Sequence, residues 1–216
     1  MHRRRRTALS AAAALLAAAP LLTACGSDAH PGAAAVIDGD RIEVAALQAQ
    51  VKDVRTAQQA SPQADQLIKA TGDLNREKLN GMIFDRVVQR VADDLGVTAS
   101  RKEVQETRRA AAEQSGGETQ LAAMLLQQQG IAPDEIDAVV RRNVLMNKVA
   151  EKLGATSTPE GQQKLTEVFG AASKALRIDV NPRYGSWDNE KIQLGEYSAP
   201  WLRRLTKEPE AAPAGA

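Results

Sequence analysis

The strongest constraint on the fold is an apolar residue at every fourth position between residues 79 and 95. These residues are Leu79, Ile83, Val87, Val91 and Leu95. They fall on one face of a helix, because an α-helix completes a turn about every 3.6 residues. Asp73 is predicted to cap the start of this helix, and Gly96 is placed to end it.

Similar spacing predicts five further helices. They cover about residues 43–59, 100–113, 118–129, 133–153 and 158–172. The pair Ser61 and Pro62 is expected to break the first of them. Ser100 and Glu103 have the spacing of a capping box, in which each side chain bonds to a backbone amide at the helix start. The chain is therefore expected to be mainly α-helical.

A small β element is expected to join the two ends of this helical region. Asp38 and Gly39 lie between β-forming residues, which is typical of a tight hairpin, although a loop before a helix is the alternative. A late strand is predicted over residues 176–180, and Pro182 ends it. Because a lone strand leaves its backbone unpaired, residues 177–181 are expected to pair with residues 34–42. Tyr184 and Trp187 are expected to cover the core beside that strand.

The N-terminus has the features of an export signal. Four arginines at positions 3–6 precede a run of alanine and leucine at 7–22, which is short for a transmembrane helix of about 20 residues. The sequence LTAC at 22–25 resembles the lipobox of bacterial lipoproteins. This resemblance implies cleavage before Cys25 and diacylglycerol on its thiol, with or without an N-acyl chain. The alternative is a secretory signal with an unmodified cysteine, and either the general or the twin-arginine export route fits.

These features predict five segments. They are a signal peptide (1–24), a lipidated tether (25–33), a helical domain (34–187), a C-terminal extension (188–207) and a disordered tail (208–216). The expected location is the extracytoplasmic face of a bacterial cell membrane, where the lipid on Cys25 would hold the chain.

Charge and composition argue against several functions. The chain has 28 Lys and Arg against 27 Asp and Glu, and the signal holds four arginines and no acid, so 24 against 27 leaves −3 after cleavage. Nucleic acid is therefore not an expected partner. The two histidines are His2 and His30, and a lipidated Cys25 leaves no thiol. We expect no metal site, no cofactor other than the lipid, no nucleotide and no enzyme activity.

The order of elements resembles the N-terminal domain of SurA and PrsA-type extracytoplasmic chaperones. The matching parts are AVIDG at 35–39 with the helix after it, residues 79–104, residues 130–153, and the end segment 178–185 with NPRYG at 181–185. The resemblance implies a helical domain that binds unfolded clients. Such chaperones often carry a parvulin prolyl-isomerase domain, but here only residues 154–158 separate the two helices where it would be inserted.

The resemblance therefore predicts an ATP-independent holdase whose partners are unfolded exported polypeptides. Trp201, Leu202 and Leu205 form an apolar group near the C-terminus that is a candidate for client contact. The same residues equally suit docking back on the domain. The alternative function is a non-catalytic adaptor or structural lipoprotein that binds one dedicated partner.

Overall fold

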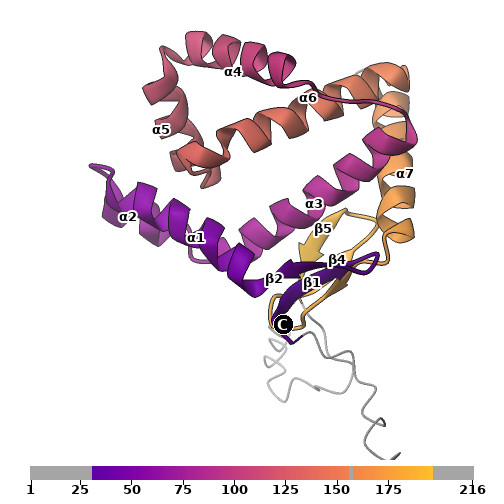
Figure 1. Cartoon of the computed structure of the whole chain (residues 1–216), viewed down its shortest axis with the longest axis horizontal. Helices are drawn as coiled ribbons and strands as arrows, with labels where there is room; N and C mark the ends of the chain where they lie inside the picture. Colours follow the sequence, from indigo (N-terminus) through magenta and orange to yellow (C-terminus); the bar gives the residue numbers. More distant parts are fainter. Residues whose placement is uncertain (1–30, 156–157, 197–216) are drawn as a thin grey trace, which may run out of the picture. The chain divides into compact units, whose positions relative to one another are not determined.

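The computed structural model describes residues 31–155 and 158–196 of the chain. Over these residues the protein is mainly α-helical with short antiparallel strands, as predicted (Figure 1). The helices are α1 (Val44–Gln59), α2 (Ala64–Ala70), α3 (Leu74–Asp94), α4 (Arg101–Ser115), α5 (Glu118–Gln129), the 3-10 helix η1 (Pro133–Glu135), α6 (Ile136–Lys152) and α7 (Pro159–Ala175). The strands are β1 (Ala33–Ile37), β2 (Asp40–Glu43), β3 (Asp179–Val180), β4 (Ser186–Asp188) and β5 (Gln193–Gly195). None of the helices in this part of the chain has the length and apolar character needed to cross a membrane.

The predicted pairing of the two ends of the helical region is confirmed. Strands β1 and β2 form a hairpin whose turn residues Asp38 and Gly39 have φ angles of 50° and 92°. β1 also pairs antiparallel with β3, where Ala35 lies opposite Val180. The strand order is β2-β1-β3. β3 begins later than predicted because Arg177, at a φ of 45°, turns the chain first.

The helix α3 is the central element of the described chain. It contacts α1, α6, α7, β1 and β5. Four residues of its predicted apolar stripe are buried, and Leu79, Ile83 and Val87 among them are fully inaccessible to solvent. The fifth, Leu95, is half-buried and follows the last residue of the helix. The predicted cap is wrong, because Asp73 has φ −98° and ψ 24° and its side chain makes no capping bond. A capping side chain needs an extended backbone at that position.

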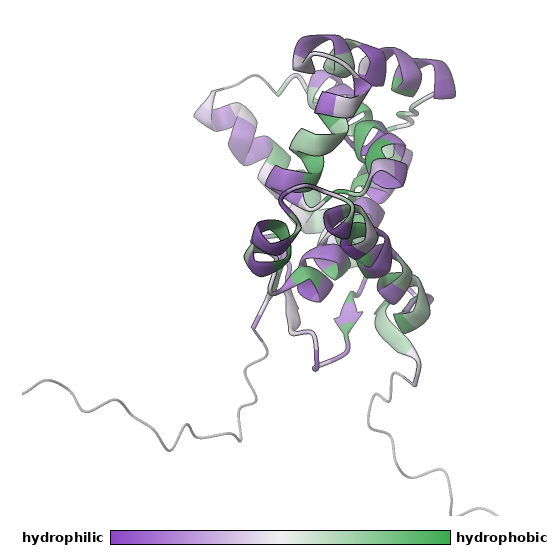
Figure 2. Ribbon diagram, turned by 90° about the vertical axis from the view of Figure 1, so that its left-hand side faces the viewer, coloured by the Kyte–Doolittle hydropathy of each residue, from purple (hydrophilic) through white to green (hydrophobic). Residues whose placement is uncertain are grey.

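Buried apolar side chains form three clusters. The first joins α3 to the β1-β2-β3 sheet, α7 and the second half of α6. The second joins α4 and α5 to the first half of α6. The third joins α1 and α2 to the start of α3 and the end of α5. In Figure 2 hydrophobic and hydrophilic residues alternate along the helices, as expected when only one side of each helix is buried.

Two other predicted helix starts agree with the structure, whereas the predicted helix 133–153 begins as the 3-10 helix η1 and continues as α6. Ser100 and Glu103 form the capping box of α4, and the Thr158 hydroxyl accepts a bond from the Gly161 amide at the start of α7. Gly130 follows α5 at a φ of 58°, which is a conformation that favours glycine. Each of these signals lies within one helical turn.

The sequence predicted six helices, and α2 is an additional one. Its place beside α1 depends on polar side chains that periodicity does not reveal. Gln58 is fully buried, and its amide donates to the Thr71 hydroxyl at 3.1 Å. Arg55 donates to the Gln58 side chain at 2.8 Å and to the Thr71 carbonyl at 2.7 Å. Because α2 buries only Leu67, it has no apolar stripe that would predict a helix. The polar network that holds it could not be recognised from the sequence.

A second hairpin, β4-β5, was also not predicted. It is attached to α7 and α3 by hydrogen bonds from both of its strands. The Trp187 indole donates to the Ser173 hydroxyl at 2.7 Å, and the Leu194 amide donates to the Asn80 side chain at 2.7 Å. Tyr184 and Trp187 pack on the first cluster, which confirms their predicted position over the core.

Candidate functional site

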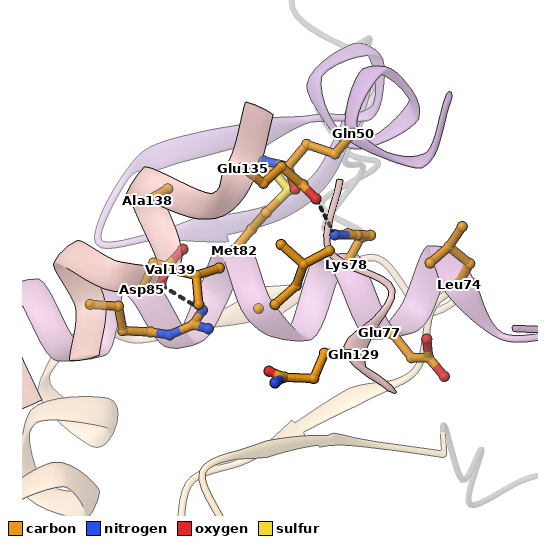
Figure 3. Close-up of a pocket in the computed structure, with 13 residues that line it drawn as sticks. Gln50, Leu74, Glu77, Lys78, Met82, Asp85, Gln129, Glu135, Ala138 and Val139 are labelled. Carbon is orange, nitrogen blue, oxygen red and sulfur yellow. Dashed lines mark hydrogen bonds and ion pairs between the residues drawn. The ribbon is translucent and has the colours of Figure 1, made fainter. Parts of the chain in front are cut away.

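A crevice of about 170 Å³ lies between α1, α3, η1 and α6 (Figure 3). Three of its apolar residues belong to different clusters. Met82 packs against the first cluster, Ile131 is part of the second, and Leu74 is part of the third. The crevice is therefore where the three clusters meet. Gly81 lies in its wall, and a Cβ atom added there would meet no atom within 4 Å. The absence of a side chain at position 81 keeps part of the crevice open.

An ion pair joins two walls of the crevice. Lys78 Nζ on α3 lies 2.5 Å from Glu135 Oε2 on η1, and the side chains are 11% and 14% exposed. The same Glu135 oxygen accepts a 2.9 Å hydrogen bond from the backbone amide of Ala132. Glu135 thus holds the turn before α6 against α3. This contact connects two walls of the crevice.

A second ion pair lies farther along α3. Arg142 Nη1 is 3.0 Å from Asp85 Oδ1, and the guanidinium stands 6.0 Å from the centre of the Phe84 ring. Burial raises the pKa of Asp85 above its usual range, and the charge and hydrogen bond of Arg142 only partly oppose this effect. Glu135 adds a smaller contribution in the same direction as burial. An additional positive charge near Asp85 would therefore stabilise its carboxylate.

The charged residues that line the crevice do not balance. Glu77, Asp85 and Glu135 carry negative charge, whereas Lys78 and Arg142 carry positive charge, so the lining has a net charge of −1. Glu77 is exposed and makes no ion pair within residues 31–155 and 158–196. The crevice is thus apolar in part and weakly acidic at its edge.

Two side-chain amides complete the lining. Gln50 comes from α1 and Gln129 from the end of α5, and neither makes a side-chain hydrogen bond to another described residue. An amide can donate to and accept from a peptide backbone. Small-molecule sites usually enclose about 300–1,000 Å³, whereas a cavity of about 150 Å³ holds a benzene-sized group. The crevice suits one large side chain of a polypeptide better than a free small ligand.

Other chemistry is not indicated by the described residues. They contain no group of three or more His, Cys, Asp and Glu side chains placed to hold a metal ion. The ion pairs of the crevice connect structural elements, and no nucleophile lies between them.

Comparison with known proteins identifies the family of the chain. A protein-family model, the SurA-like N-terminal domain, matches residues 1–150. The chain belongs to this family. All residues that line the crevice lie within the matched region, whereas α7 and the β4-β5 hairpin lie beyond it. No curated protein and no solved structure matches the chain.

The SurA-like N-terminal domain is a chaperone-type domain, and the predicted resemblance to the N-terminal domain of these chaperones is confirmed. The match is to this domain alone, and no parvulin domain is detected.

The structure does not describe the site residues that the sequence predicted. Cys25, Trp201, Leu202 and Leu205 all lie outside the described residues, so lipidation and client contact remain predictions. The sequence alone did not reveal the crevice residues, because they come from five elements (α1, α3, α5, η1 and α6). The one available signal was Gly81, an isolated glycine inside a helical pattern, where glycine costs about 1 kcal/mol relative to alanine.

Proposed function

We propose that this protein is an ATP-independent chaperone that holds unfolded exported polypeptides at the extracytoplasmic face of the bacterial cell membrane. The observation that carries the proposal is the crevice between α1, α3 and α6, which lies wholly inside the SurA-like region. Its apolar wall and its two amides suit an extended segment that presents one large side chain. A lipid on Cys25 would keep this crevice where exported chains emerge.

The proposed mechanism is reversible binding without turnover. An unfolded chain exposes apolar side chains that promote aggregation. Binding of such a side chain beside Met82 would lower the concentration of aggregation-prone chain, and no nucleotide is needed for that effect. The ion pair between Lys78 and Glu135 would keep the crevice formed before the client arrives.

Light scattering of aggregating proteins tests this function. The chain from Gly26 to Ala216 should suppress aggregation of several unrelated unfolded proteins near equimolar amounts and without ATP. Gly81→Leu should abolish most of the effect by filling the crevice. Gly72→Leu is the matched control, because Gly72 also has open space at its Cβ but does not line the crevice. The proposal would be contradicted if the unchanged chain did not suppress aggregation. It would also be contradicted if Gly81→Leu and Gly72→Leu suppressed aggregation equally.

The second candidate is an adaptor lipoprotein with one dedicated partner. The small volume of the crevice favours it, because a single side-chain site can be selective. The adaptor would leave unrelated clients unprotected and would bind one partner whose affinity is reduced by Gly81→Leu. The same pair of glycine variants therefore serves both candidates.

A further inference from the structure

We infer that residues 201–207 of this chain bind in its own crevice, with Trp201 on the apolar wall and Arg203 and Arg204 beside the acidic edge. This inference rests on the proposed function for its biological meaning, because it names a regulator of the same site. Its evidence is independent and consists of where the described chain ends, how far the next residues reach, and their charge.

The last described strand, β5, lies beside a hollow that shares a residue with the crevice. Gln193 and Leu194 form a hollow with Asp73, Arg76, Glu77 and Asn80 on α3, and its volume is about 360 Å³. Glu77 lines both this hollow and the crevice. The Leu194 amide is bonded at 2.7 Å to Asn80, the residue next to Gly81 of the crevice wall. The last described residue, Glu196, is two positions further along the chain.

The following segment is long enough to reach the crevice. Trp201 comes five positions and Leu205 nine positions after Glu196. At about 3.3–3.6 Å per extended residue, they can lie roughly 17 Å and 30 Å from it. From Glu77 to Asp85 the helix α3 rises only about 12 Å, at about 1.5 Å per residue. The segment can therefore pass Glu77 and run along the crevice.

The chemistry of the segment matches the crevice. Residues 197–207 read YSAPWLRRLTK and contain three cationic residues and no acidic residue. The crevice lining has a net charge of −1, and Glu77 at its edge makes no ion pair with a described residue. Arg142 only partly offsets the rise that burial causes in the pKa of Asp85. Trp201 and Leu202 supply the large apolar side chain that the volume suits.

An attached segment competes strongly with a free client. A short flexible connection gives an effective concentration on the order of millimolar. A client would then have to displace residues 201–207, so weak or sparse clients would be excluded. The crevice would be covered whenever no strong client is present.

The test uses a fluorescent peptide of residues 198–209 and measures its binding by anisotropy. One partner is the chain from Gly26 to Ala216, and the other is the same chain with Trp201→Ala, Leu202→Ala and Leu205→Ala. The peptide should bind the triple variant at least about tenfold more tightly, because the attached competitor is lost. A peptide with Arg203→Glu and Arg204→Glu should bind several-fold more weakly.

Two charge variants locate the site. In the triple variant, Glu77→Lys should weaken peptide binding several-fold at low salt and less at high salt. Glu113→Lys is the matched control, since Glu113 is an exposed residue of α4 that does not line the crevice. As a second measurement, Gly81→Leu should move the Trp201 emission to longer wavelength relative to Gly72→Leu. The Trp201 emission is the difference between chains with and without Trp201→Phe, because Trp187 also emits.

Three results would overturn the inference. They are equal affinity of the peptide for the intact chain and the triple variant, equal effects of Glu77→Lys and Glu113→Lys, and no binding to any variant. Aggregation suppression is measured on the same proteins. If suppression persists while the peptide fails to bind, only this inference is wrong. If the peptide binds as expected and no client is protected, the proposed chaperone function is wrong.

Discussion

Lys78 and Glu135 are 57 residues apart in sequence, yet their charged atoms lie 2.5 Å apart at the edge of the crevice. Both side chains are largely withdrawn from water. The pair connects α3 to the turn before α6, and the Ala132 amide bonds to the same carboxylate oxygen. Loss of either charge would leave the other poorly solvated and without its partner.

The first prediction concerns this pair. Lys78→Met should lower the free energy of unfolding by about 3 kcal/mol, because Glu135 would remain as an uncompensated charge. Urea denaturation measures the change. The control is Lys102→Met, which removes a lysine whose ion pair with Glu106 is exposed, and it should have a much smaller effect. Equal losses from the two variants would show that the Lys78–Glu135 pair is not a structural contact.

The second prediction is a pH dependence at Glu103. A hydrogen bond from Lys148, followed by bonds from the Ser100 amide and hydroxyl, lowers the pKa of Glu103 to about 2 from its usual 4.5. Because the folded-state pKa is the lower one, the stabilisation is present above about pH 4.5 and is lost as the pH falls toward 2.

Denaturation of Glu103→Gln at a series of pH values tests this sign. The stability difference from the unchanged chain should be largest near neutral pH and should shrink as the pH falls below about 4.5. Glu113→Gln is the control, because it makes the same substitution at an exposed position of α4, and its effect should not follow this pH dependence. A difference for Glu103→Gln that stays constant down to the lowest pH would contradict the prediction.

The third prediction concerns Gly185, which has a φ of 127°. A Cβ atom there would lie 2.1 Å from the carbonyl oxygen of Gly195 on β5. Gly185→Ala should therefore destabilise the protein by at least about 2 kcal/mol and detach the β4-β5 hairpin. Thermal unfolding measures the loss, and hydrogen exchange at Leu194 reports the hairpin.

Gly81→Ala provides the opposite expectation. Gly81 lies inside α3 with space around its Cβ, so alanine should stabilise the helix by about 0.5–1 kcal/mol. If Gly185→Ala leaves the stability unchanged or raises it, as expected for Gly81→Ala, the backbone account of Gly185 is wrong.

The fourth prediction concerns export and lipidation. The mature chain should begin at Cys25, carry diacylglycerol on its thiol and sediment with membranes. Cys25→Ser should prevent lipidation and release the exported chain from the membrane fraction, whereas Ser27→Ala should change neither result. Mass spectrometry of the N-terminal peptide is the deciding measurement. An unmodified Cys25 thiol in the mature chain would contradict the prediction that a lipid on this residue holds the chain at the membrane.

Much of the helical content was predictable because its signals are local. The stripe of α3, the capping box of Ser100 and Glu103, and the glycine after α5 each depend on residues within a few positions of one another. The pairing of β1 with β3 was also predictable, since few other segments could form hydrogen bonds with the backbone of a late strand. Local signals failed for Asp73, where the backbone conformation prevents capping.

Only the tertiary structure decided the crevice and the path of the C-terminal hairpin. Asp85 and Arg142 are 57 residues apart, and Asn80 and Leu194 are 114 apart, so no periodicity or capping rule relates them. The sequence by itself determined which faces of the helices must be buried and which family the chain resembles. It did not determine which buried faces meet, because many packings bury the same apolar area and polar contacts between distant residues select among them.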